Sequence, residues 1–168
     1  MSTTGFTSTC DLYDEFLDEA RVPSLAWRSF GGRKAFCGPT VTVKCFEDNS
    51  RIKELVESVG EGRVLVVDAG ASHRCAVMGD MLAGHAADNK WAGIVVQGYV
   101  RDVQALAEID VGVIALGCTP RKSTRRGEGQ VDLPIRIGDV DCRPGDWIFC
   151  NQDGVLILTS QQAEERKK

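Results

Sequence analysis

The middle of the chain alternates apolar, β-branched segments with segments of helical character, and this alternation constrains the fold more than any other feature. Apolar runs at residues 63–68, 91–97 and 111–116 have the pattern of buried strands. Helices are expected between them, at 79–90 and, shorter, near 103–107. Strands separated by helices pair in parallel through right-handed crossovers. The sequence therefore predicts an α/β fold.

The flanking regions complete one domain that spans residues 1–168. An amphipathic helix is expected at 8–20 and a strand at 35–46. The polar cluster Asp48-Asn49-Ser50 is typical of a helix cap and precedes a helix at 51–59. Further strands are expected at 74–78, 133–137, 146–150 and 155–158, followed by a charged tail at 160–168 that is helical or frayed. We expect an α/β domain with two sheet regions.

Composition excludes several classes of protein. The net charge of −4 argues against a general nucleic-acid coat protein, so no direct nucleic-acid contact is expected. The longest purely apolar runs, such as residues 64–67, are far shorter than the roughly 20 residues of a transmembrane helix. The N-terminal residues have neither the basic nor the apolar region of a secretory signal. We expect a cytoplasmic protein without a membrane partner.

The cysteines agree with that location. There are seven, an odd number, and none forms a Cys-x-x-Cys motif, which argues against a disulfide framework or a zinc ribbon. Most lie in apolar, strand-like segments, and all seven are interpreted as reduced core residues. The sequence also has no Gly-x-Gly-x-x-Gly after a strand, no P-loop and no Gly-x-Ser-x-Gly, and its two histidines do not form a zinc-hydrolase motif.

The first candidate ligand-binding segment is Gly79-Asp80-Met81-Leu82, because a Gly-Asp turn leads into a helix there. The free N–H groups of a helix start, together with the helix dipole, can bind a carboxylate. The alternative is that Asp80 only caps the helix.

Gly98-Tyr99-Val100-Arg101-Asp102 is the second, because it follows an apolar strand at the edge where α/β sheets bind ligands. Asp102 offers a carboxylate to a divalent metal, and Arg101 offers a guanidinium to a substrate oxyanion. The alternative is a surface ion pair of little energetic value. Twenty residues, one helix plus one strand, separate Asp80 from Arg101, so both loops can lie at the same edge of the sheet.

Both segments belong to a longer series that resembles a known family, the regulators of ribonuclease E activity A, which also contains the 4-hydroxy-4-methyl-2-oxoglutarate aldolases. The similarity runs from about Cys10 to Leu158. Besides the two segments above and Pro120-Arg121-Lys122-Ser123, it is carried by residues 30–33, 43–49, 62–68, 110–113, 127–129, 144–146 and 153–155.

The resemblance implies a swivelling β/β/α fold (phosphohistidine-domain-like), assembled as a homotrimer or a dimer of trimers. Aldolase members carry an Asp, twenty residues, then Arg-Asp, and Asp80, Arg101 and Asp102 match that pattern. By this match Asp102 binds Mg²⁺ or Mn²⁺, and Asp80 acts through a metal-bound water. Arg101 binds the keto or enolate oxygen. The segment from Gly79 holds the pyruvate carboxylate on the backbone amides around Met81 and Leu82.

The implied function is that of a metal-dependent class II aldolase and decarboxylase. Its substrates would be small 2-oxo dicarboxylates, namely 4-hydroxy-4-methyl-2-oxoglutarate and oxaloacetate, and its product pyruvate. The alternative is a non-catalytic regulator that binds and inhibits an endoribonuclease of the ribonuclease E type. Such members tend to lack the Asp and Arg-Asp set, which is complete in this sequence.

Three features need separate interpretation. Many aldolase members have an acidic residue three positions after the Arg-Asp pair, where this chain has Ala105, and longer members have a C-terminal extension with no equivalent expected after Lys168. The basic run at residues 121–126 is open to three interpretations. It is a solvated loop, a lid that attracts a di- or tricarboxylate, or an RNA contact.

Overall fold

Three parallel strands form the centre of the main sheet, as the alternation predicts. They are β3 (Val64–Asp68), β5 (Gly93–Val100) and β6 (Gly112–Cys118). In this computed structural model, which describes residues 6 and 8–166, β5 lies between β3 and β6. Both faces of β3 are buried, which explains why its sequence is continuously apolar rather than alternating.

The prediction of two sheet regions is wrong in one respect, because the C-terminal strands extend the main sheet. Strand β2 (Phe36–Lys44) pairs in parallel with β3 and, through its first half, antiparallel with β10 (Trp147–Asn151). Strand β11 (Gly154–Leu158) follows as a hairpin. The order in the nine-stranded sheet is β1-β6-β5-β3-β2-β10-β11, with β4 beside β5 and β7 beside β2. Only β8 (Ile135–Ile137) and β9 (Val140–Cys142) form a separate pair.

The main sheet curls into a nearly closed barrel-like form, and Phe36 shows this curvature at the level of side chains. Its ring packs directly on the backbones of Gly93 in β5 and Gly112 in β6, although one strand lies between β2 and β5 in the sheet order and two lie between β2 and β6. A Cβ atom at either glycine would overlap the ring, so these strands need glycine there. The fold is thus a mixed α/β domain; no observation identifies it as the phosphohistidine-type swivelling domain.

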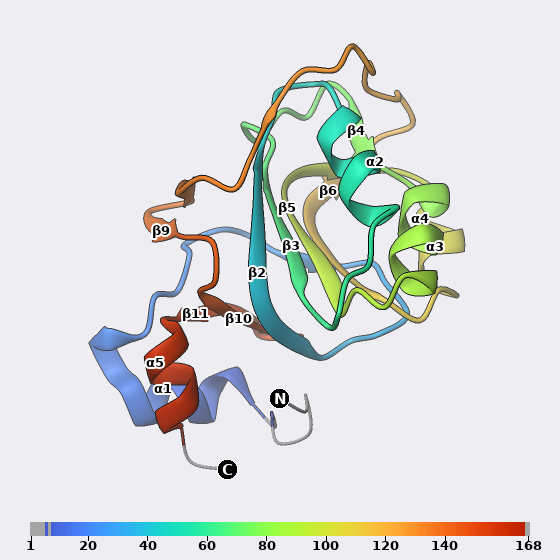
Figure 1. The fold of residues 1–168 in the computed structure, drawn as a ribbon. Helices are drawn as coiled ribbons and strands as arrows, with labels where there is room; N and C mark the ends of the chain where they lie inside the picture. The colour runs from blue at the N-terminus through green and yellow to red at the C-terminus, as the bar shows by residue number, and fades with distance from the viewer. Residues whose placement is uncertain (1–5, 7, 167–168) are drawn as a thin grey trace.

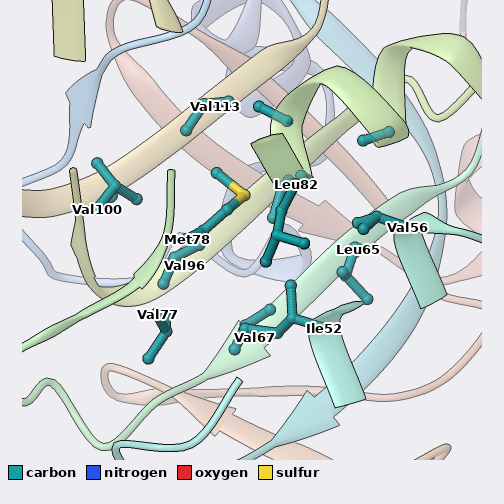
Figure 2. Close-up of a cluster of buried hydrophobic side chains, with 14 of the residues drawn as sticks. Ile52, Val56, Leu65, Val67, Val77, Met78, Leu82, Val96, Val100 and Val113 are labelled. Carbon is teal, nitrogen blue, oxygen red and sulfur yellow. The ribbon is translucent and has the colours of Figure 1, made fainter. Parts of the chain in front are cut away.

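Helices cover the outer face of the sheet. They are α2 (Ser50–Val56), α3 (Asp80–Asp88) and the short α4 (Val103–Leu106), and they lie together beside β3, β5 and β6 (Figure 1). Leu65 and Val67 point toward these helices, where they meet Ile52, Val56 and Leu82 (Figure 2). The alternate residues of β3 pack with Phe36 in a second buried cluster. This packing fixes the start of α3 above the ends of the strands.

The terminal segments pack together on β10 and β11 (Figure 1). The helix expected at 8–20 is α1 (Thr9–Phe16), capped by the Ser8 side chain, followed by one 3₁₀ turn (Leu17–Glu19). The predicted tail forms α5 (Ser160–Glu165), which has a capping box between Thr159 and Gln162; residues 167–168 lie outside the described part.

Three short strands complete the fold: β1 (Arg28–Ser29), β4 (Ala76–Met78) and β7 (Gln130–Val131). Strands β1 and β7 were not predicted, and β4 begins two residues later than the strand expected at 74–78. The interpretation of all seven cysteines as core residues is wrong for Cys10 and Cys118, which are exposed. Both lie at the ends of elements, in α1 and at the end of β6. Among the described residues, no helix has the length and apolarity needed to cross a membrane.

Candidate functional site

The two sequence segments meet because β4 and β5 end side by side. The strands pair in parallel, with Met78 opposite Val100, and the Arg101 N–H donates to the Met78 carbonyl oxygen at 2.9 Å. The sequence predicts that β5 ends at Gln97, but the strand continues to Val100 across a shift in its register with β6. This extension places Arg101 and Asp102 directly beside Gly79.

Gly79 is the N-cap of α3, and its close approach to the second segment requires a residue without a side chain. An added Cβ atom would overlap the Asp102 carboxylate and would lie 2.9 Å from Cγ of Arg101. Because glycine offers no side-chain acceptor, the N–H groups of Met81 and Leu82 in the first helical turn are available to a ligand. Asp80 is the first helical residue rather than the cap, so the capping interpretation is wrong.

Asp102 has a left-handed backbone conformation, with φ 60° and ψ 43°. It precedes α4 as the N-cap residue, yet its side chain makes no capping hydrogen bond there. Instead its Oδ2 atom accepts from the Asp80 N–H at 3.3 Å. The backbone turn therefore directs a carboxylate away from its own helix and toward the start of α3, a geometry that Asp tolerates better than most residues.

Arg101 has unused hydrogen-bonding capacity. Its Nε atom is buried and has no hydrogen-bond partner among the described residues, while 37% of its side chain is exposed. Asp102 Oδ1 lies 3.9 Å from this Nε, too far for a hydrogen bond. A buried, unbonded guanidinium N–H is unfavourable unless a ligand or water accepts from it.

These residues line one cavity of about 590 Å³. Every site residue named from the sequence lies in its wall: Gly79, Asp80, Met81, Leu82, Arg101 and Asp102. The structure thus brings together all the residues that the resemblance singled out. Ala105 of α4 is not among the residues that line the cavity.

A second wall of the cavity comes from the basic run, whose contribution the sequence left open. Lys122, Ser123, Thr124 and Arg125 line the cavity together with Asn49. Lys122, Arg125 and Arg101 are the three cationic side chains of the cavity. Its two carboxylates are those of Asp80 and Asp102. The cavity therefore favours anionic ligands. The charge of this run was visible in the sequence, but its place in the wall was not.

Buried Asp48 anchors the basic run. The carboxylate accepts from the N–H groups of Ser50 at 2.9 Å and Arg126 at 2.5 Å, and Oγ1 of Thr124 lies 3.4 Å from it. Burial opposes ionisation of this group, but the hydrogen bonds from Ser50, Arg126 and Thr124 outweigh it and lower the pKa of Asp48. The cluster Asp48-Asn49-Ser50 therefore binds a distant loop as well as starting α2.

We expect Asp48→Asn to destabilise the protein by about 1–3 kcal/mol at pH 7, because the variant loses charge-assisted hydrogen bonds. A carboxyl group whose pKa is lower in the folded state stabilises the fold above its unfolded-state pKa and loses this effect as the pH falls through the folded-state value. The difference from wild type should therefore shrink below about pH 4. Urea unfolding at several pH values measures it, with exposed Asp18→Asn as the control; a difference independent of pH would contradict this account.

The donor set at the cavity suits a hard divalent cation better than zinc. Among residues 6 and 8–166, no cluster of three or more His, Cys, Asp or Glu side chains could hold a metal. The half-exposed carboxylate of Asp102, with Asp80 in the same wall, offers oxygen atoms alone. Mg²⁺ commonly binds through one or two carboxylates and keeps several waters, so these residues fit Mg²⁺ or Mn²⁺.

Comparison with known proteins identifies the family of this chain. A family model described as "RraA-like: Aldolase/RraA" matches residues 9–157. The chain belongs to the RraA-like family. A relative in Alcanivorax borkumensis is 52% identical over 149 residues, which cover 88% of this chain and 93% of that protein. One in Pseudomonas syringae pv. tomato is 51% identical over 152 residues, which cover 90% and 94%. Both carry the name "Putative 4-hydroxy-4-methyl-2-oxoglutarate aldolase".

Solved structures of RraA-like architecture carry more varied names. The structure of the RNA-processing inhibitor RraA from Thermus thermophilis has a TM-score of 0.87 and 40% identity, covering 91% of this chain and 93% of that one. A protein from Geobacillus kaustophilus, described as an S-adenosylmethionine: 2-dimethylmenaquinone methyltransferase, has a TM-score of 0.91 and 38% identity, covering 96% and 100%. One fold thus carries several described activities, and the site must decide among them.

Proposed function

We propose that this protein is a divalent-metal-dependent lyase that releases pyruvate from 4-hydroxy-4-methyl-2-oxoglutarate and from oxaloacetate. One observation carries the proposal: Asp80, Arg101 and Asp102 converge on one cavity at the start of α3, where the N-cap residue is a glycine. Arg101 there has a buried N–H without an acceptor, which the oxygen of a 2-oxo acid would supply. The aldolase names of the relatives point to the same reaction.

Substrate binding follows from the two sides of the cavity. The carboxylate of the pyruvate moiety accepts from the N–H groups of Met81 and Leu82, where the helix dipole adds to the attraction. The C2 oxygen lies against the guanidinium of Arg101. This arrangement orients the bond between C3 and C4 of the substrate above the Asp80 and Asp102 carboxylates.

In the aldol cleavage, Asp80 accepts the proton of the C4 hydroxyl, directly or through one water molecule. The bond between C3 and C4 breaks, C4 becomes the keto carbon of one pyruvate, and the electron pair moves to the C2 oxygen of the other. Arg101 stabilises this oxyanion. Protonation of C3 then yields the second pyruvate. With oxaloacetate the same enolate forms when CO₂ leaves, and no C4 hydroxyl proton has to move.

A divalent cation, when bound, supplies Lewis-acid stabilisation of the charge that develops on the C2 oxygen. Asp102 is the residue that would hold it. The left-handed backbone at this position directs the carboxylate into the cavity, where Oδ2 accepts from the Asp80 N–H and no capping bond to α4 occupies Oδ1. A cytoplasmic location is part of the proposal and accords with seven free thiols.

Two other functions suggested by relatives are weaker at this site. Methyl transfer, which the description of the Geobacillus protein names, requires neither a metal-binding carboxylate nor an oxyanion-binding guanidinium, so it leaves the convergence of Asp102 and Arg101 unexplained. Inhibition of an endoribonuclease is compatible with the Thermus protein's description as an RNA-processing inhibitor, and it needs a protein-binding surface and no catalytic cavity. It is the second candidate, supported by 40% identity to that inhibitor.

A coupled pyruvate-release assay tests the proposal. We expect release from both substrates with Mg²⁺ or Mn²⁺ and its loss in EDTA. Free metal ions decarboxylate oxaloacetate slowly, so the rate without protein is subtracted at each metal concentration. Absence of protein-dependent release from either substrate would reject the lyase and bring the regulator to first place. Assembly as a homotrimer or a dimer of trimers, also proposed, is measured by light scattering on the same sample, and a monomer would reject it.

A further inference from the structure

The cavity extends well beyond the groups needed to hold pyruvate. Met81, Leu82, Arg101 and Asp102 form one wall, and the second wall consists of Asn49 and the segment from Lys122 to Arg125. None of the second group has a part in the chemistry proposed above. A volume of about 590 Å³ leaves room for a second polar end of the substrate between these walls.

In this second wall, the side chain of Asn49 orients the guanidinium of Arg125. Its Nε–H donates to Oδ1 of Asn49 at 3.1 Å. This bond uses only one of the guanidinium's N–H donors and leaves the terminal nitrogens for a bidentate contact with a carboxylate. Arg125 also acts electrostatically on Glu57, but that carboxylate is paired with Lys53 at 2.5 Å. The charge of Arg125 therefore remains available to a ligand.

The backbone on both sides of Arg125 is anchored, which reduces the cost of ordering it. The Thr124 N–H and the Arg126 N–H bind the Glu47 carbonyl oxygen and the Asp48 carboxylate, respectively. Upstream, Ser123 donates to the Ala76 carbonyl oxygen at 3.0 Å, which ties the segment to β4. A binding group held in place before the ligand arrives loses less conformational entropy on binding. The segment is thus a built wall rather than a loose lid.

We propose that Arg125, oriented by Asn49, binds the second carboxylate of the substrate and selects 2-oxo dicarboxylates over 2-oxo monocarboxylates. The inference rests on the proposed function, because it assumes that the pyruvate end lies at Arg101 and the start of α3. Among the three interpretations of the basic run, it takes up attraction of a dicarboxylate and assigns this role to one residue, as a fixed specificity contact rather than a lid. Arg121 and Arg126 of the same run do not line the cavity and supply internal controls.

Two non-cleavable ligands isolate the second carboxylate. 2-Oxoglutarate and 2-oxopentanoate share the 2-oxo acid end and the chain length, and only the first has a terminal carboxylate. Neither has a C4 hydroxyl, so calorimetric titration in the presence of Mg²⁺ measures binding independently of turnover. The titrations use the wild-type protein and the variants Arg125→Ala, Arg125→Lys and Arg126→Ala.

We expect Arg125→Ala to weaken 2-oxoglutarate binding at least tenfold and to change 2-oxopentanoate binding less than twofold. Arg125→Lys should recover part of the loss, because it keeps the charge without the bidentate fork. Arg126→Ala should bind both ligands as wild type does, and thermal unfolding verifies that each variant is folded. Equal weakening of both ligands, no effect on either, or no measurable binding of 2-oxoglutarate by wild type would overturn the proposal. Selective binding without pyruvate release would instead retain it and reject the lyase.

Discussion

Asp102→Asn should lower metal-dependent pyruvate release by about 100-fold or more, because a carboxylate that holds a catalytic cation supplies several kcal/mol of transition-state stabilisation. Asn has the same shape as Asp and tolerates the left-handed backbone that this position requires (φ 60°). It also retains an oxygen that can accept from the Asp80 N–H. The substitution therefore removes the charge with little change in the fold.

A matched control distinguishes this effect from a general loss of surface charge. Asp88 lies at the opposite end of α3 and is exposed, so Asp88→Asn should retain wild-type kcat/KM. Mn²⁺ binding, followed by electron paramagnetic resonance, gives a readout that does not depend on turnover. We expect Asp102→Asn to bind Mn²⁺ weakly and Asp88→Asn to bind it normally. Full activity of Asp102→Asn would show that Asp102 is not a ligand of a catalytic metal.

Much of the fold could be predicted because the strands differ in pattern from the helices. The β-branched runs of β3, β5 and β6 are buried on both faces, and such strands have a continuous apolar signal. The pairing of β2 with β10 could not be predicted, because antiparallel pairing between segments a hundred residues apart leaves no local sequence pattern. Two-residue strands such as β1 and β7 are also too short for periodicity to detect.

The candidate site was predictable where its residues are adjacent in sequence or one crossover apart. The spacing of Asp80 and Arg101 suggested a common edge, and the pairing of Met78 with Val100 accounts for it. The second wall was not predictable, because Arg125 is held at the cavity by contacts of its segment with residues distant in sequence, such as Asp48 and Asn49. The three residues Asp48-Asn49-Ser50 have the sequence of a helix cap, and nothing local distinguishes a cap from an anchor for a distant loop.

Gly79→Ala should lower the rate of pyruvate release by about 100-fold, although the methyl group that it adds is far smaller than the cavity. The new Cβ would lie 2.9 Å from Cγ of Arg101 and would overlap the Asp102 carboxylate, so both functional side chains must move. Displacements of about 1 Å at catalytic groups can cost about two orders of magnitude in rate. Stability should fall by about 1–3 kcal/mol, as is usual for overpacking.

Gly84→Ala in the same helix is the matched substitution, since no described atom outside the adjacent helix backbone lies within 4 Å of its added Cβ. It should keep wild-type kcat/KM and stabilise the protein by up to about 1 kcal/mol, because alanine favours helix more than glycine does. Urea unfolding and the pyruvate assay measure both variants side by side. If Gly79→Ala were as active as Gly84→Ala, the close contact of the two segments would have no catalytic importance. Loss of activity in Gly79→Ala alone would show that the reaction depends on the contact between the start of α3 and the Arg101-Asp102 pair.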